Sequence, residues 1–174
     1  MNKQEIIRLL EKSYTAFSDE IEVMNEDEFR KFARGKWNAS QHADHLNRSL
    51  LPLIFALKLP VLLAKMLFGK AKQSSSTYED LVTKYLTKLA SGSKAVHPFI
   101  PSRFAYKSKE TLLKKLNANL KNLLRLLEKY QENQFDEIML PHPILEKITL
   151  REMLYFTIYH AVHHRKLMLK NLEA

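Results

Sequence analysis

The chain contains no cysteine and little glycine or proline, and these shortages narrow the chemistry open to it. The absence of cysteine from 174 residues excludes disulfides, thiolate metal ligands and a cysteine nucleophile. With only three glycines and six prolines, the composition argues against a fold built from many hairpins and loops. A transition-metal site would therefore use histidine with aspartate, glutamate or water, which excludes the usual sulfur-rich structural zinc sites.

Long uncharged hydrophobic runs are missing as well. The most hydrophobic stretch, residues 49–68, is interrupted by Pro52, Lys58, Pro60 and Lys65, and no uncharged run in it approaches the roughly 18 residues of a membrane span. We interpret it as a buried helix with a break at proline, an interfacial membrane helix being the alternative. The first residues show no secretory signal pattern. We therefore expect a cytoplasmic protein without a membrane partner.

The chain carries a large excess of positive charge. Twenty-eight lysines and arginines against 19 acidic residues give a net charge of +9 and a pI near 9.6. Such an excess is compatible with binding to nucleic acid or to an anionic surface. The basic residues are scattered over the polar sides of predicted helices, however, without an arginine-rich run or interleaved aromatics. We therefore expect a solvated basic surface and no nucleic-acid partner.

Helical periodicity dominates the sequence, and strand alternation is nearly absent. The expected helices cover residues 2–23, 38–58, 76–89, 108–131 and 149–172. Residues 69–76 read as a linker, and 91–107 and 133–148 as irregular loops. These elements predict an all-α fold, a four-helix bundle with one shorter inserted helix, forming a single domain over residues 1–174.

Capping signals place the beginnings of several of these helices. A capping box joins an N-cap side chain to a Glu or Gln three residues later. The sequence offers three such pairs: Asn38 with Gln41, Ser76 with Glu79, and Thr149 with Glu152. Ser108 is the expected N-cap of the long helix that follows it.

Five of the seven histidines fall into two clusters, each within a predicted helix. One cluster is His42 and His45, and the other is His160, His163 and His164. The pair His160 and His164, four residues apart, places two imidazoles one turn apart on one helix face, as in metal-binding helices. A third histidine from another helix would complete a site with an open position, which is typical of catalytic metals.

The helical wheel decides some of these orientations and leaves others open. His160 and His164 lie at the centre of the apolar face of the last helix, with His163 to one side. In the second helix, His42 falls near the centre of the inner face and His45 at its margin, so periodicity alone does not choose between them. Buried histidines can also form a metal-free hydrogen-bonded network or line a wet pocket, and this alternative stays open.

Three segments resemble the DinB/YfiT superfamily of metal-binding four-helix bundles. The segments are Trp37–Leu46, with a histidine eight residues after the tryptophan, Pro141–Glu152, which resembles the loop and cap before the last helix, and Tyr159–His164, which resembles the terminal His-x-x-His-His motif. Glu146 stands where the family's loop often carries glycine. The resemblance spans nearly the whole chain, and it implies an up-down-down-up bundle with a long crossover connection.

The resemblance also implies a set of metal ligands. His45, His160 and His164 would hold a divalent metal ion, zinc or nickel, a choice that overrides the wheel's preference for His42. His42 and His163 would then stand behind the ligands or line the pocket. The resemblance leaves the catalytic residues unknown.

Metal-dependent thiol transfer is the leading functional hypothesis, since the characterised enzymes of that family are mostly thiol transferases. A low-molecular-weight thiol, activated at the open position, would attack an electrophilic small-molecule substrate. The alternatives are a metal-dependent hydrolase and a non-catalytic metal-binding or interaction bundle. No obvious carboxylate base accompanies the expected ligands, which counts against hydrolysis.

Four other features carry weaker expectations. Asp44 could orient a ligand, but its place on the helix wheel faces away from the expected pocket. His142, in a Pro-His-Pro sequence, could line the entrance, although a plain surface turn is the commoner arrangement. The apolar residues of 59–68 would suit a homodimer contact, and specificity is expected in residues 69–107, which carry no readable motif.

Overall fold

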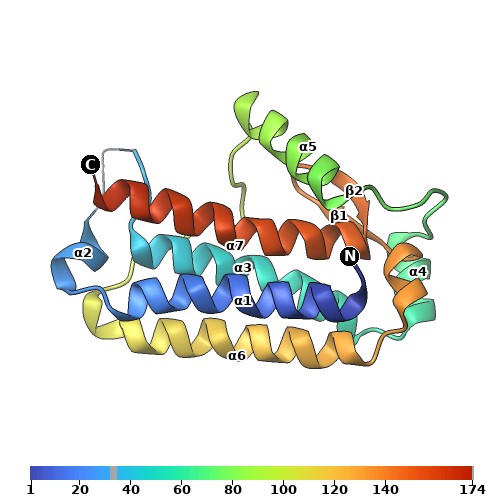
Figure 1. Ribbon diagram of the computed structural model, residues 1–174, viewed down its shortest axis with the longest axis horizontal. Helices are drawn as coiled ribbons and strands as arrows, with labels where there is room; N and C mark the ends of the chain where they lie inside the picture. Colours follow the sequence, from blue (N-terminus) through green and yellow to red (C-terminus); the bar gives the residue numbers. More distant parts are fainter. Residues whose placement is uncertain (32–34, 174) are drawn as a thin grey trace.

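The computed structural model of the protein describes residues 1–31 and 35–173. Four long helices lie side by side along the molecule: α1 (Lys3–Glu22), α3 (Ala39–Lys58), α6 (Lys109–Glu128) and α7 (Leu150–Leu172) (Figure 1). Each of α1 and α3 packs against both α6 and α7. Their inward stripes, with side chains such as Leu10, Phe17, Leu46 and Leu123 fully buried, form the core. The predicted all-α four-helix bundle is confirmed.

The helix directions give the up-down-down-up order. In Figure 1, α1 and α7 run one way, and α3 and α6 run the other. Because α3 and α6 are parallel, the chain between them must return along the bundle, and this long crossover carries α4 (Val61–Phe68) and α5 (Tyr78–Ala90). Helix α5 packs against α7, outside the four-helix core. The short α2 (Glu26–Arg30) packs against α3.

Two of the three predicted capping boxes are present. The Asn38 and Thr149 side chains accept from the backbone N–H groups of Gln41 and Glu152, which bond back to the cap residues. The predicted box at Ser76 is wrong, because α5 begins one residue later. Its cap is Thr77, whose hydroxyl accepts from the N–H of Asp80 at 3.1 Å.

The predicted cap at Ser108 is wrong in its chemistry, although α6 does begin directly after it. Ser108 has helical backbone angles (φ −93°, ψ −1°) and its side chain makes no capping hydrogen bond. A side-chain cap requires extended backbone at the cap residue. Here a 3₁₀ turn, Tyr106–Ser108, leads into α6 instead.

Residues 133–148, predicted to be irregular, contain regular structure. A 3₁₀ turn (Glu132–Asp136) is followed by the antiparallel strands β1 (Met139–His142) and β2 (Glu146–Thr149). Glu146 has a φ of +67°, in the left-handed region that glycine adopts most readily. Its backbone therefore takes a glycine-like conformation at the start of β2, and the hairpin delivers the chain to the cap of α7.

The prediction of a buried helix over residues 49–68 is wrong for its second half. The chain turns by 118° between α3 and α4, at Pro60, whereas Pro52 is accommodated inside α3. In α4, Leu62 and Met66 are 72% and 74% exposed. Among the described residues no single helix has the length and apolarity to cross a membrane, while the bent pair α3 and α4 meets both criteria together.

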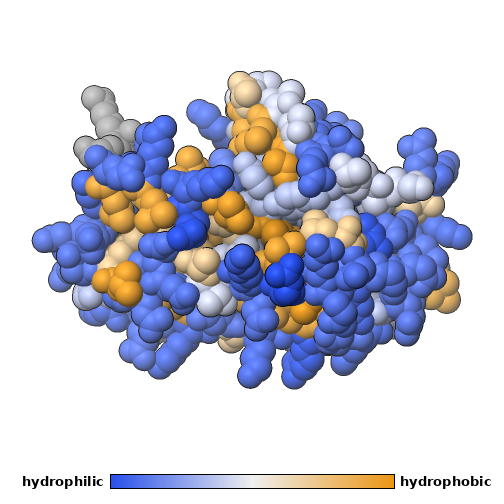
Figure 2. Space-filling view, viewed as in Figure 1, coloured by the Kyte–Doolittle hydropathy of each residue, from blue (hydrophilic) through white to orange (hydrophobic). Residues whose placement is uncertain are grey.

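The surface seen in Figure 2 is mostly hydrophilic, in keeping with the scattered basic residues. Apolar side chains gather on this face along α5 and where α5 rests on α7. Helix α5 thus behaves as a cover over α7, and the candidate site lies between α3 and the α7 surface beside it.

Candidate metal centre

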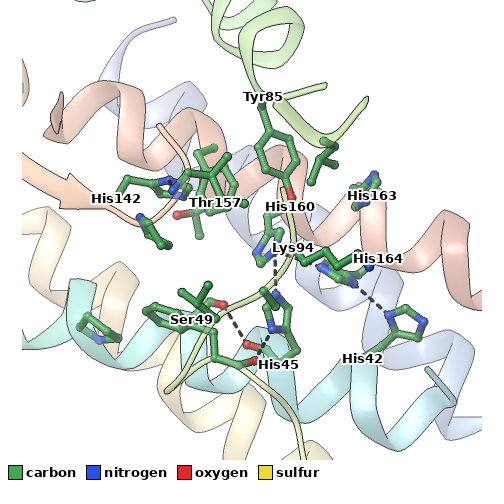
Figure 3. A pocket seen from close by; sticks show the side chains of 18 of the residues that line it. His42, His45, Ser49, Tyr85, Lys94, His142, Thr157, His160, His163 and His164 are labelled. Carbon is green, nitrogen blue, oxygen red and sulfur yellow. Dashed lines mark hydrogen bonds between the residues drawn. The ribbon is translucent and has the colours of Figure 1, made fainter. Parts of the chain in front are cut away.

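Helices α3 and α7 run antiparallel, which brings their histidines into register. His42 faces His164, with 2.8 Å between the two Nδ1 atoms, and His45 faces His160, with 3.1 Å between the two Nε2 atoms (Figure 3). The Nε2 atoms of His160 and His164, one turn apart on α7, are 3.0 Å apart. All four side chains are buried. The structure therefore brings together four of the five histidines that the sequence singled out.

Three of these side chains direct a ring nitrogen toward one point. His45, His160 and His164 each offer one nitrogen, and the three atoms lie within 4.8 Å of one another. Both wheel candidates on α3 point inward, but only His45 joins the group. His42 lies behind it, against the far nitrogen of His164.

The protonation of His45 follows from its outer partner. Its Nδ1 lies 2.7 Å from the carbonyl oxygen of Phe99. A carbonyl oxygen only accepts hydrogen bonds, so the single proton of the neutral ring sits on Nδ1 and Nε2 holds a lone pair. This lone pair points at His160. A carbonyl partner on the outer nitrogen is the usual arrangement for a metal-bound histidine.

The nitrogens of the cluster are not all satisfied by hydrogen bonds. The Nε2 of His42 and the Nδ1 of His160 are buried without a partner among the described residues. A buried polar atom without a partner costs about 1–3 kcal/mol. The Nε2 of His160 also faces two other nitrogens and can share at most one proton with them. A divalent cation, taking one lone pair from each ligand, would satisfy the three converging Nε2 atoms and would leave the two outer nitrogens unchanged, so it is the converging atoms that fit a metal.

Burial keeps the imidazoles neutral. It lowers the pKa values of His160 and His164 well below the ordinary range, and repulsion from the neighbouring imidazoles adds to the effect. Burial also lowers the pKa of His45, with partial opposition from the Phe99 carbonyl and Asp44. Burial, with repulsion from His45 and His163, lowers the pKa of His42 to about 3, against the opposing effect of the Trp37 backbone. Neutral imidazole is the form that binds metals.

Aromatic rings hold the imidazoles in place. Trp37 stacks on His164 with ring centroids 5.8 Å apart and an angle of 9° between the ring planes. Phe156 stacks on His160 with ring centroids 4.6 Å apart. His163 is half-buried and lies outside the nitrogen cluster, edge-on to the ring of Tyr85 at 6.0 Å. It lines the same cavity.

A clamp on α3 holds the loop that supplies the Phe99 carbonyl. The carboxylate of Asp44 accepts from Arg48 Nε at 2.7 Å and from the backbone N–H of Ser102 at 2.8 Å. Arg48 donates in turn to the carbonyl of Pro98 at 3.3 Å. Asp44 points away from the cavity, as its place on the helix indicated, and its hydrogen bonds connect it to the loop that carries the Phe99 carbonyl.

A cavity of about 770 Å³ opens beside the histidine cluster. Its walls come from residues 35–37, α3, α5, the 94–100 loop, the turn of the hairpin and α7, and they are mainly apolar. Its charged lining side chains in the described parts of the chain are Lys36, Lys94 and Lys170, with no aspartate or glutamate among them. Part of this wall, including the 94–100 loop, belongs to residues 69–107, where we expect the residues that determine substrate specificity.

His142 also lines the cavity, and the prediction of a surface turn is wrong. The side chain is 7% exposed, and its Nδ1 accepts from the N–H groups of Ile144 and Leu145 at 3.1 and 2.9 Å. It thus fixes the hairpin turn while one face packs on Phe156. The roles of Phe99, Tyr85 and Lys94 gave no sequence signal, because their segments lack a motif.

Comparison with known proteins gives two matches. The model of a family described as the DinB superfamily matches residues 9–168. Among solved structures, the chain is similar to YfiT from Bacillus subtilis, described as a probable metal-dependent hydrolase with an unusual four-helix bundle topology. The identity is 20%, the TM-score 0.62, and the alignment covers 97% of this chain and 85% of the other, which shows a shared fold. None of the curated proteins compared matches the chain.

Proposed function

Because this chain belongs to the DinB superfamily, and because its fold gathers three histidine nitrogens, we propose that His45, His160 and His164 bind a divalent metal ion. The observation that carries the proposal is the convergence of their Nε2 atoms, 3.1 Å and 3.0 Å apart in the two closest pairs. The outer carbonyl partner of His45 supports it. The metal dependence named for the Bacillus subtilis protein supports it independently.

The donor set favours zinc or nickel. Imidazole nitrogen suits borderline ions such as these, whereas calcium and magnesium prefer oxygen ligands. Three protein ligands leave a position open to a small molecule. At that position a bound ion would lower the pKa of a thiol or water, and so supply a nucleophile at neutral pH.

We further propose that the nucleophile is a low-molecular-weight thiol, whose sulfur would form a bond to an electrophilic carbon of a small molecule while a leaving group such as halide departs with its bonding pair and the thiol proton passes to a base. The described lining of the cavity contains no carboxylate that could take a proton from water. A thiol, with an ordinary pKa near 8.5, gives up its proton far more readily than water does. Burial and Lys166 lower the pKa of His163, so its imidazole is neutral near pH 7 and can accept the thiol proton.

Hydrolysis is the second candidate, favoured by the description of the Bacillus subtilis protein. The two reactions differ in one requirement, since transfer consumes thiol and hydrolysis does not. An aryl halide assayed with and without added thiol, beside an activated ester assayed without thiol, separates them. Turnover of the halide that requires both thiol and metal supports transfer, and ester turnover without thiol supports hydrolysis.

The first test is the metal content of purified, tag-free protein. We expect about one zinc or nickel ion per chain in the parent. Almost none should remain in the His45→Ala, His160→Ala, His164→Ala triple variant, whose circular dichroism should stay helical. His97→Ala, an exposed loop position, is the matched control and should keep the metal. A parent protein that stays metal-free after incubation with both ions would overturn the proposal.

A further inference from the structure

The cavity has a direction, set by the antiparallel arrangement of α3 and α7. His42 contacts His164 and His45 contacts His160, so residues toward the C-terminal end of α3 lie beside residues toward the N-terminal end of α7. Beyond the His45–His160 pair, the lining residues are mostly apolar on both helices, including Leu53 on α3 and Met153 on α7, with Ser49 and Thr157 as the polar exceptions next to the pair. Figure 3 shows the same order, with His142 on one side of His160 and His42 on the other.

The opposite end of the cavity is cationic. Asn171 donates to the carbonyl of Trp37 at 3.0 Å, which ties the end of α7 to the segment before α3. Lys36 and Lys170, the sequence neighbours of these two residues, therefore border the cavity at the same end. Lys94 lies on the loop that crosses the cluster in Figure 3.

These lysines are not neutralised. None of the three forms an ion pair or a hydrogen bond with another described residue, and no carboxylate borders the cavity in the described parts of the chain. Clefts lined by charge of one sign with low-dielectric walls concentrate ligands of the opposite sign. The lysine end therefore selects for an anionic group.

The apolar part of the cavity extends to its rim. Three of the lining side chains, Phe55, Val96 and Ile100, are 63%, 51% and 54% exposed. Exposed apolar side chains gathered around a groove are typical of ligand-binding surfaces. The volume of about 770 Å³ is in the range that encloses a drug-sized molecule.

We propose that the electrophilic substrate is an amphipathic organic anion. Its acidic group binds at the end bordered by Lys36 and Lys170, with Lys94 of the crossing loop as a third cation beside the cluster, and its apolar body fills the end near Leu53 and Met153. The histidine cluster then faces the middle of the molecule, between these two ends. The assignment as substrate rests on the proposed function, whereas the binding itself depends only on the cavity.

Calorimetric titration of chelator-treated, metal-free protein tests this binding directly. The probes are decanoate below its micelle concentration, decyltrimethylammonium with the same chain, and butyrate with the same acidic group. We expect decanoate to bind on the order of tenfold more tightly than either of the others, since only it matches both ends. Equal affinity for decanoate and decyltrimethylammonium would overturn the assignment of the anionic end.

Variants separate the two ends. The Lys36→Gln, Lys94→Gln, Lys170→Gln variant should lose on the order of tenfold in decanoate affinity. A control with the same loss of charge replaces the exposed Lys115 and Lys121 on α6 and Lys129 at its C-cap, none of which lines the cavity, and should bind normally. An equal loss in the control would reduce the effect to net charge and overturn the proposal.

The apolar end has its own variant. Met153→Trp, checked for folding by circular dichroism, should weaken decanoate binding by filling this end of the cavity, and unchanged binding would contradict the placement. Because every titration uses metal-free protein, its outcome does not depend on the metal proposal, which is tested by the metal content alone. The substrate proposal fails or stands on these affinities.

Discussion

The three proposed ligands differ in what lies behind them. The outer nitrogen of His45 has a backbone carbonyl, that of His164 has the His42 ring, and that of His160 has no partner among the described residues. A partner behind a ligand fixes its proton and its orientation, and its removal commonly weakens metal binding. In the proposed site, His42, which the helix wheel favoured as a ligand, would therefore act on the metal through His164.

Removal of His42 should weaken metal binding without abolishing it. In His42→Phe the Nδ1 of His164 loses its hydrogen-bond partner, and we expect the affinity for zinc to fall by roughly 10–100-fold. His42→Gln, whose side-chain oxygen can accept from Nδ1, should restore most of it. Competition with a chromophoric chelator measures both, with His97→Ala as the control. An affinity unchanged in His42→Phe would show that His42 only fills space.

Acid should destabilise the hairpin through His142. Burial lowers the pKa of this side chain from 6.5 to about 4, so below pH 6.5 the unfolded chain binds a proton that the folded chain does not. The stabilisation is therefore complete above pH 6.5 and is lost as the pH falls toward 4. The full contribution of this pKa shift to the free energy of unfolding is on the order of 3 kcal/mol.

His142→Asn tests this dependence. The asparagine oxygen can accept from the same two N–H groups but does not titrate. Urea unfolding of metal-free protein from pH 7 to 4.5 should show a shallower loss of stability in the variant than in the parent. Parallel curves for the two proteins would assign the acid sensitivity to other groups.

At the scale of elements, the 94–104 segment owes its position to α3. Asp44 and Arg48 bind the backbone at Ser102 and Pro98, and Ser40 accepts from the N–H of Phe104 at 3.1 Å. The segment forms one wall of the cavity and supplies the carbonyl behind His45. This segment, which has little secondary structure of its own, is thus held in place by side chains of α3, the helix that also carries His45.

Asp44→Ala should release this loop. The substitution removes a carboxylate that is 5% exposed, and with it the hydrogen bond from the N–H of the exposed Ser102, a loss of about 1 kcal/mol. Amide hydrogen exchange at residues 98–102 should accelerate, and zinc affinity should fall. Glu110→Ala, which breaks the exposed pair with Lys114, is the control and should change neither. Slow exchange retained in Asp44→Ala would contradict the clamp.

The sequence-based predictions that were wrong, the irregular loop over residues 133–148 and the capping box at Ser76, also concern single elements. The strands of the hairpin have four residues each, too few for alternation to stand out, and the turn is fixed by the His142 side chain and not by glycine. Ser76 has the right spacing for a capping box, but its hydroxyl and N–H are engaged by Glu152 on α7. Local patterns cannot register a tertiary partner of this kind.

At the scale of the molecule, the long helices were predictable because their apolar stripes continue over five or six turns. The histidine spacing on α7 was predictable for the same reason. The choice between His42 and His45 was not, since both are buried, and their roles depend on which side of α7 faces α3. Resemblance to the family supplied His45, and the geometry agrees with that grouping while leaving metal binding to experiment.

Metal binding, as proposed, would join two antiparallel helices of a bundle that already has its own core. The chelator-treated protein should therefore stay folded, unlike small domains that need their metal to fold. Zinc should still raise the midpoint of thermal unfolding, because a ligand bound only by the folded state stabilises it by about 2.7 kcal/mol at 100 times its Kd.

Differential scanning calorimetry with graded zinc measures this shift, and the triple histidine variant is the control in which it should vanish. The shift should change little between pH 7.5 and pH 6, because burial keeps the pKa values of His160 and His164 well below the ordinary range and the folded ligands therefore stay neutral. An equal rise of the midpoint in the triple variant would place the zinc elsewhere on the chain. Collapse of the parent on chelation would mean that the ion, and not the helical core, holds α3 against α7.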